Sequence, residues 1–244
     1  YPSEYMTAGL SNNMSDIKQV SFFMEECKRM GLQVLGPDVN ESFYKFTVNE
    51  NYAVRFGIGA VKGVGMNAVQ TIVENRKDGK YKSIFDLTKR IDLRAANKKA
   101  LENLVLAGGF DSFEGTTRAQ YFHDDGDGIT FYEKAIRYGA KFQENENSSQ
   151  VSLFGEASEV QIAEPVVPPC EDWSTMEKLA REKEVVGIYI SGHPLDDFKF
   201  EMKYFCNSKL DALKNMEQYV GKTLAFGGIV SNVQRRIAKN GKEW

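Results

Sequence analysis

Residues 56–76 read "FGIGAVKGVGMNAVQTIVENR", and this stretch organises the middle of the chain. A short apolar run is followed by a Gly-hydrophobic-Gly turn at Gly63–Val64–Gly65 and then by apolar residues at helical spacing. These residues would form the buried side of a helix: Ala68, Val69, Ile72 and Val73. The pattern predicts that residues 57–76 are helical on both sides of a glycine turn.

This arrangement resembles a helix-hairpin-helix, a motif that binds nucleic-acid backbone. Glycines allow backbone conformations closed to other residues, and they remove side chains where a phosphate must approach. Free amides at the second helix's N-terminus can then bind the phosphate, aided by the helix dipole. Such contacts carry no sequence information. The alternative is a tight turn between two helices in which the glycines serve packing alone.

The residues after the hairpin are rich in lysine and arginine between Arg76 and Lys99, with few acids. A charge run is usually a solvated face, but beside a phosphate-binding hairpin it favours a DNA-backbone surface. The predicted DNA-binding residues are Lys62, Gly63, Val64, Gly65, Lys89, Arg90, Arg94, Lys98 and Lys99. Residues 97–113 contain Ala107–Gly108–Gly109, a degenerate candidate for a second hairpin. Paired with the first hairpin, it would straddle the two strands of a duplex.

A second candidate site is "SQVSLFG" at residues 149–155. It matches the Gln-x-x-Leu-Phe form of the peptide by which bacterial DNA-processing proteins bind a sliding clamp. Such a peptide works in an extended form, with apolar side chains in a partner's pocket. The predicted clamp-binding residues are Gln150, Val151, Ser152, Leu153 and Phe154. The alternative is a loop whose Leu and Phe fold back onto their own core.

Composition limits the class of protein. The 244 residues are 42% hydrophobic and 27% charged, as in ordinary folded proteins, and no apolar run reaches membrane-spanning length. Cys27, Cys170 and Cys206 form no CxxC pair, which argues against disulfides or zinc and fits a reducing cytoplasm. The net charge of −3 predicts that nucleic acid binds only at a local patch. Both ends look cut, so we expect a piece of a longer protein.

The fold class that we expect is α+β and mostly helical. Asp16 and Ser15 can cap a helix that runs to about Met30, and Asn49–Asn51 can turn a β-hairpin. Ser83 and Asn97 can cap two further helices. Further along, the pattern predicts a helix over 131–142 and mostly loop over 143–175. A helix resumes near Ser174, and residues 223–237 have the character of a β-strand.

Other constellations do not support catalysis or metal binding. "HDDGDGITFYEK" (123–134) resembles a calcium loop, but its first position is His123 and its closing Glu133 is one residue off. His123 and His193 are 70 residues apart and lack triad partners. We predict no catalytic and no metal-ligating residue here.

Several pieces in order resemble the C-terminal half of the alpha subunits of bacterial DNA polymerase III. They are "YPSEYMTAGLSNNM", "EECKRMGLQVLGPDVNES", "VRFGIGAVKGVG", "FDLTKRIDL", "NKKALENLVLAGGFDSF", "QVSLFG", "EKEVVGIYISGHPLDDF" and "GGIVSNVQRR". The resemblance implies that residues 1–50 end the fingers domain. Residues 51–205 would be a tandem helix-hairpin-helix and clamp-binding domain. Residues 206–244 would begin a truncated OB-fold, with Arg235, Arg236, Lys239 and Lys242 near an early strand.

The resemblance also implies function. The parent would perform template-directed DNA synthesis with Mg²⁺ held by palm aspartates that precede residue 1, so this piece would need no cofactor. Its partners would be the duplex backbone, the sliding clamp (beta subunit), single-stranded template on the OB-fold, and other holoenzyme subunits, with no membrane. One rival is a non-catalytic, clamp-associated scaffold of DNA repair. Another is a helix-hairpin-helix DNA glycosylase with Asp86 as its catalytic carboxylate. The Leu-Pro that usually begins such a hairpin is absent, and Val61–Lys62 stands in its place.

Overall fold

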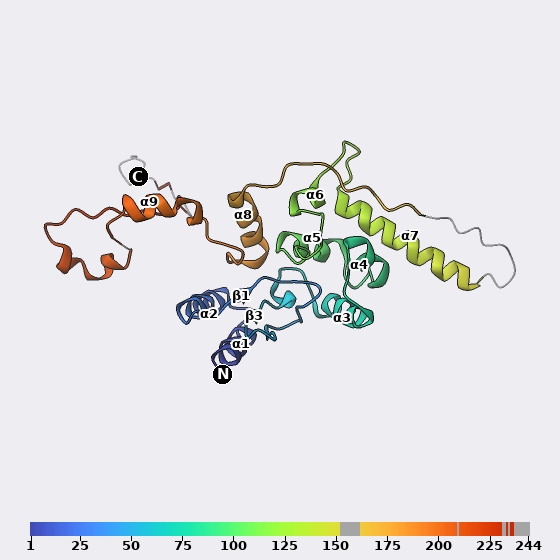
Figure 1. The fold of residues 1–244 in the computed structure, drawn as a ribbon, viewed down its shortest axis with the longest axis horizontal. Helices are drawn as coiled ribbons and strands as arrows, with labels where there is room; N and C mark the ends of the chain where they lie inside the picture. The colour runs from blue at the N-terminus through green and yellow to red at the C-terminus, as the bar shows by residue number, and fades with distance from the viewer. Residues whose placement is uncertain (152–161, 209, 231–232, 234, 237–244) are drawn as a thin grey trace. The chain divides into compact units, whose positions relative to one another are not determined.

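The computed structural model describes residues 1–151, 162–208, 210–230, 233 and 235–236, with only the backbone described for 147–151 and 211 (Figure 1). The chain divides into two compact units, Tyr1–Ser191 and Gly192–Trp244, which are described separately. The described residues are mostly helical and include one three-stranded sheet, as the sequence predicts. Among them, no helix combines the length and the apolar composition needed to cross a membrane.

The first unit begins with helices α1 (Pro2–Asn12) and α2 (Ile17–Arg29). Asp16 caps α2, as predicted, because its Oδ1 accepts hydrogen bonds from the amides of Lys18 at 2.9 Å and Gln19 at 3.3 Å. Gly31 follows the helix with φ +72°, the left-handed conformation that glycine adopts without strain.

A small sheet follows, in the order β1 (Val34–Leu35), β3 (Val54–Arg55) and β2 (Thr47–Val48). The β1 and β3 strands are parallel, whereas β2 and β3 form the predicted antiparallel hairpin. The Asn49 side chain closes that turn by accepting from the amides of Asn51 and Ala53. The hairpin spans the predicted domain boundary at residue 50, and both sides of it belong to one compact unit.

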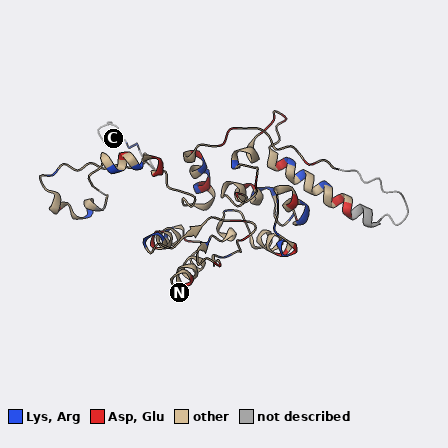
Figure 2. Ribbon diagram, in the orientation of Figure 1, with Lys and Arg blue, Asp and Glu red and all other residues tan. Residues whose placement is uncertain are grey.

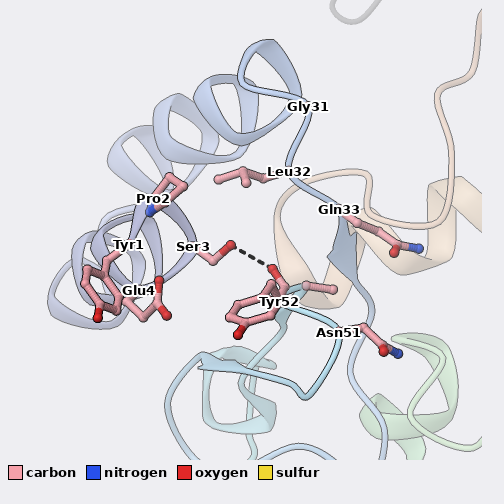
Figure 3. A pocket seen from close by; sticks show the side chains of 10 residues that line it. Tyr1, Pro2, Ser3, Glu4, Gly31, Leu32, Gln33, Asn51 and Tyr52 are labelled. Carbon is pink, nitrogen blue, oxygen red and sulfur yellow. Dashed lines mark hydrogen bonds between the residues drawn. The ribbon is translucent and has the colours of Figure 1, made fainter.

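A pocket lies where this hairpin meets α1 (Figure 3). Tyr52 at its wall has φ 57°, unusual for a residue with a side chain, and Ser3 Oγ donates to its carbonyl at 2.7 Å. The wall also includes Glu4, Gln33 and Asn51 but no lysine or arginine side chain. This pocket therefore does not have the charge of a phosphate-binding site.

The central helices surround the glycine hairpin. They are the 3₁₀ turn η1 (Ile58–Ala60), α3 (Met66–Asn75), the 3₁₀ turn η2 (Arg76–Asp78), α4 (Ile84–Arg90), α5 (Lys98–Leu106) and α6 (Arg118–Phe122). Ser83 and Asn97 cap α4 and α5 as predicted, since their side chains accept from the Asp86 and Ala100 amides. The α3, α4 and α5 helices share one apolar core with α1, α2 and the sheet.

Helix α7 (Phe131–Val151) lies beside α4 (Figure 1). The prediction of a helix ending at residue 142 followed by loop is wrong for residues 143–151. Gln143 explains part of the difference, because its Nε2 donates to the carbonyls of Thr88 at 2.9 Å and Ile91 at 2.9 Å near the end of α4. A tertiary contact thus carries the helix into a polar stretch that has no apolar stripe of its own.

After the undescribed residues, the chain returns in extended form over 162–173 and enters α8 (Thr175–Val186). Gln120 of α6 donates to the Pro168 carbonyl at 3.0 Å, which fixes this segment against α6. Gly187 ends α8 in the left-handed conformation, with φ +87°.

The second unit contains the 3₁₀ turn η3 (Asp196–Phe198), helix α9 (Lys199–Tyr204) and the 3₁₀ segment η4 (Leu210–Tyr219), broken at Asn215. The β-character predicted for 223–237 is wrong for 223–230, which contain no strand. The Ala225 backbone bonds instead to a side chain 18 residues earlier, since Asn207 Oδ1 accepts from the Ala225 amide at 2.8 Å. Arg235 and Arg236 are exposed and outside any strand, whereas Lys239 and Lys242 lie outside the described residues.

Candidate nucleic-acid interface

The glycine hairpin runs from η1 into α3. Gly63 has φ +77°, and the Val64 amide donates to the Val61 carbonyl at 3.1 Å, which closes the turn. Val64 points inward and is 4% exposed, whereas Gly63 and Gly65 are exposed. The turn therefore presents backbone rather than side chain to solvent, as the sequence predicts.

The first helical half of the hairpin is shorter than predicted, a single 3₁₀ turn. The amides of Ile58 and Gly59 are used by the carbonyls of Phe43 and Tyr44, at 2.9 and 3.1 Å. An added Cβ at Gly57 would lie 2.6 Å from the Tyr44 carbonyl oxygen, so this segment packs directly on backbone. Those contacts prevent a full α-helical turn.

The N-terminus of α3 is open. Gly65 occupies the cap position, and within the described part of the chain no side chain caps this helix. An added Cβ at Gly65 would meet nothing within 4 Å. The first amides of a helix have no partner inside it, and the helix dipole adds partial positive charge there. The opposite side of α3 is buried through Ala68, Val69 and Ile72, which fixes the direction of these amides.

The cations of this region fall into two groups, and Figure 2 shows the lysine and arginine positions of α4 in blue. Some cations of the hairpin and of the basic stretch after it are exposed, and their side chains form no hydrogen bond or ion pair with any residue that the structure describes: Lys62, Lys77, Lys80, Lys82 and Arg94. Lys62 lies in the hairpin itself. The loop that carries Arg94 lies against α3, because the Asp92 amide donates to Thr71 Oγ1 at 2.8 Å.

The remaining cations already have partners. Lys89 Nζ lies 3.0 Å from Glu164 Oε1 and above the Tyr138 ring, and Lys99 pairs with Glu102 at 2.8 Å. Lys98 pairs with Glu133. Burial opposes the charge of Lys89, but its hydrogen bonds to Tyr138 and Glu164 outweigh this and raise its pKa. Such ion pairs are weak at a surface and open to exchange with phosphate.

Arg90 is held most firmly in the predicted DNA-binding set. Its guanidinium donates to the carbonyls of Asn75 and Gly79 and to Asp86, and it stacks over the Tyr81 ring at 4.6 Å. These contacts join the end of α4 to the end of α3. The structure therefore gives Arg90 a role in the fold, whereas its DNA contact stays a prediction.

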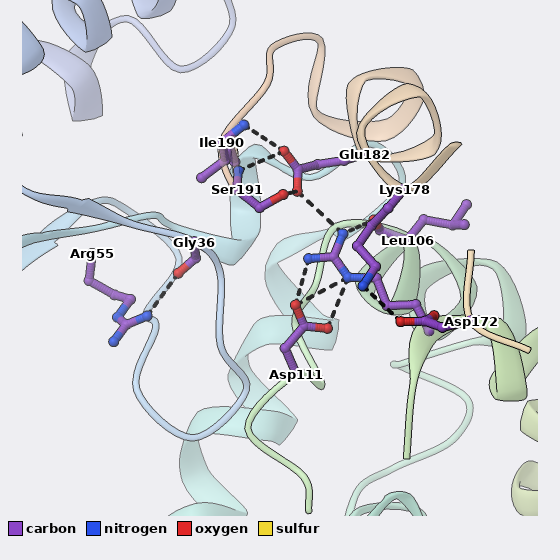
Figure 4. Close-up of polar contacts among 10 residues, drawn as sticks. Gly36, Arg55, Leu106, Asp111, Asp172, Lys178, Glu182, Ile190 and Ser191 are labelled. Atoms are coloured by element: carbon purple, nitrogen blue, oxygen red, sulfur yellow. Dashed lines mark hydrogen bonds and ion pairs between the residues drawn. The ribbon is translucent and has the colours of Figure 1, made fainter. Parts of the chain in front are cut away.

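The candidate second hairpin is occupied by a side chain. Gly108 has φ +86°, and an added Cβ there would collide with the guanidinium of Arg118. Arg118 is buried and pairs with Asp111 at 2.6 Å and with Glu182 of α8 at 3.3 Å (Figure 4). Burial opposes its charge, but the two carboxylates outweigh this and raise the pKa of Arg118. Sequence reasoning missed this network because Glu182 is 64 residues from Arg118.

The helix after this turn also differs from α3. Thr117 and Gln120 form a capping box in which each side chain accepts a hydrogen bond from the other residue's amide. The helix after the second turn is therefore capped by side chains, unlike α3.

The predicted clamp peptide lies at the end of α7. The α7 backbone includes Gln150 and Val151, while Ser152, Leu153 and Phe154 lie outside the described residues. Clamp binding by this peptide stays a prediction.

The acidic turn at 123–134 is filled by a lysine. Lys134 Nζ lies 3.0 Å from both Asp125 Oδ2 and Asp127 Oδ2, and its hydrogen bond lowers the pKa of Asp127. Within the described ranges, no group of three His, Cys, Asp or Glu residues could hold a metal ion.

Comparisons with known proteins agree with this geometry. A family model described as a helix-hairpin-helix motif matches residues 31–121, which include the whole hairpin from η1 to α3. The DNA polymerase III subunit alpha of Vibrio cholerae is 32% identical over 243 residues, which cover 99% of this chain and 20% of that protein. The chain is homologous to a segment of the DNA polymerase III alpha subunits.

Two further alpha subunits support this assignment. The Campylobacter jejuni protein is 36% identical across 100% of the chain, and the Escherichia coli K12 protein is 34% identical across 99%. The chain spans 20% of the length of each of these relatives. The similarity to DNA polymerase III alpha extends through both compact units, since it covers nearly every residue.

Proposed function

We propose that this segment binds the backbone of duplex DNA through the hairpin at residues 62–65, within a DNA polymerase III alpha subunit. One observation carries the proposal: the α3 amides at Gly65 are exposed, uncapped by any described side chain, and bordered by open space. An anion fits such a helix N-terminus because the donors and the dipole both point toward it.

The exposed cations and the ion-paired cations would contribute to binding in different ways. Lys62, in the hairpin, and Arg94, in the loop that lies against α3, are exposed and supply positive charge, while Lys77, Lys80 and Lys82 follow α3. Lys89, Lys98 and Lys99 would bind phosphate only after exchanging their present carboxylate partners. Such binding is independent of base sequence, because backbone amides and lysines contact phosphates rather than base edges.

The wider role belongs to the parent protein. The alpha-subunit homology supports a parent that performs template-directed DNA synthesis, with the Mg²⁺-dependent step in parts outside this segment. We further propose that residues 150–154 bind the sliding clamp and that 206–244 begin an OB-fold for single-stranded template. Two weak contacts on one assembly raise each other's effective concentration and so favour processive synthesis. The three free cysteines fit a cytoplasmic protein.

Duplex binding can be tested with the 244-residue chain and fluorescently labelled duplexes of two unrelated sequences. We expect equal affinities, with the logarithm of the binding constant falling linearly with the logarithm of salt concentration. Arg94→Glu should weaken binding to both duplexes and reduce the salt slope by about one, as expected for one lost phosphate contact.

Lys28→Glu is the matched control for Arg94→Glu. It makes the same change of two charges on the exposed surface of α2, and it should alter the affinity much less. Equal effects of the two variants would mean that only the overall charge matters. Affinities that differ between sequences, or that ignore salt, would contradict the proposed mode of binding.

A further inference from the structure

The hairpin turn is held on both sides through one residue, Lys62. Its amide donates to the Val185 carbonyl at 2.9 Å, in the last turn of α8. Its carbonyl accepts from Asn103 Nδ2 of α5 at 2.6 Å. The turn is thus fixed by residues of two later helices, and the nearer of these residues, Asn103, is 41 positions from Lys62 in the chain.

Asn103 is unusual for its position. It is 2% exposed within the apolar side of α5, where the residues around it are Leu101, Leu104 and Val105. Its Oδ1 is buried and has no hydrogen-bond partner among the described residues. Leaving such a group unpaired is unfavourable, so the fold gains little from Asn103 beyond its single bond to Lys62.

The contact also sets the position of the glycine. An added Cβ at Gly63 would lie 3.3 Å from Asn103 Nδ2, so the amide group lies directly behind the turn. Gly63 is in the left-handed conformation and precedes the open amides of α3. A turn that is free to move would have to be ordered at the moment of binding, which weakens affinity.

We infer that Asn103 is a positioning residue for the DNA-binding hairpin: it orders Lys62–Gly65 so that the α3 amides are preset for a phosphate. This inference rests on the proposed function for its purpose, but the ordering itself is independent of DNA. The role belongs to Asn103 because, among the described residues, its side chain bonds only to Lys62, while Val185 contributes through its backbone.

The test uses Asn103→Leu in the 244-residue chain. Leucine removes the donor to Lys62, removes the unpaired Oδ1, and is a better helix former than asparagine. The melting temperature should therefore stay the same or rise. Asn103→Ala repeats the test without added volume, in case leucine does not fit.

The first readout is amide hydrogen exchange without DNA. The Lys62 and Val64 amides should exchange faster in Asn103→Leu, while the Val54 amide, which donates to Gln33 in the sheet, should not change. The second readout is duplex affinity, which should fall about three- to tenfold because the turn must be ordered on binding. Asn13→Leu is the matched control, since Asn13 Nδ2 also donates to a backbone carbonyl, that of Gly9 in α1.

The outcomes separate this inference from the proposed function. Unchanged exchange at Lys62 and Val64 in both variants would overturn the inference, whatever happens with DNA. Faster exchange with unchanged duplex affinity would overturn it as well, because the ordering would then serve no binding. If the unaltered chain binds no duplex, the proposed function fails, and the exchange data still decide whether Asn103 orders the turn.

Discussion

At the scale of single residues, Tyr81 shows how the fold supports the hairpin. Its buried hydroxyl donates to the Ile72 carbonyl of α3 at 2.8 Å. The Asn40 side chain accepts from the Tyr81 amide and donates to the Tyr81 carbonyl. Arg90 covers its ring. Tyr81 therefore joins the region before β2 to the C-terminal half of α3, whose other end carries the open amides.

Burial raises the pKa of Tyr81 to about 12, from 10.0. The folded protein thus favours the neutral phenol more than the unfolded chain does. This stabilisation is complete below about pH 10 and is lost as the pH rises toward about 12, with roughly 2–3 kcal/mol at stake for Tyr81. We expect the free energy of unfolding, measured with urea, to fall across this window.

Tyr81→Phe should show a smaller decline in the free energy of unfolding between pH 10 and 12 than the unaltered chain. Tyr121 and Tyr132 are also buried and also have a pKa of about 12, so part of the decline should remain. An identical decline in the two proteins would show that Tyr81 is not protected from ionisation as described.

At the scale of helices and strands, local signals in the sequence predicted most of the framework. Asp16, Ser83 and Asn97 marked helix starts correctly because each satisfies amides within its own helix. Tertiary contacts decided the rest. Gln143 extends α7 by bonding to α4, and the carbonyls of Phe43 and Tyr44 shorten the first half of the hairpin. Neither partner is near in sequence, so periodicity could not reveal them.

The candidate site follows the same division. Gly63 and Gly65 were predictable because the turn needs glycine geometry, whereas the state of each cation was not. Lys89 and Arg90 are neighbours in sequence, but one pairs with Glu164 and the other with the Asn75 and Gly79 carbonyls. The sequence did not identify Asn103, because nothing about an asparagine within a helix indicates a hydrogen-bond partner 41 residues away.

Helix α8 provides a test of the buried ion network. Glu182 is 1% exposed, pairs with Arg118, and also accepts from the Ser191 amide at 3.0 Å and hydroxyl at 2.7 Å. Glu182→Gln removes one charge of a buried pair and should cost about 3–5 kcal/mol of unfolding free energy.

Lys178→Gln is the control on the same helix, because Lys178 pairs with Asp172 at 3.1 Å near the surface. Surface pairs of this kind contribute about 0–1 kcal/mol. Urea unfolding of the two variants measures the difference. Equal losses of stability would show that burial does not strengthen the role of Glu182.

At the scale of the whole molecule, the net charge of −3 and the predicted DNA binding are compatible because binding needs only a local excess of positive charge. Acidic residues in the first unit pair with many of the lysines, and Arg118 is enclosed by its own carboxylates. Lys62 in the hairpin, Arg94 in the loop against α3 and the uncapped start of α3 are exposed. We propose that a phosphate of the duplex binds at these uncapped amides.

Gly65→Asp, compared with Gly65→Ala, tests whether the α3 amides bind a phosphate. Both variants place a Cβ where nothing lies within 4 Å, at a backbone conformation open to any residue. Only aspartate can cap the α3 amides with its own carboxylate, which should keep or slightly raise the melting temperature. We predict that Gly65→Asp lowers duplex affinity more than about tenfold, since the carboxylate takes the place of the phosphate, and that Gly65→Ala changes it little. Equal duplex affinities for the two variants would contradict the account.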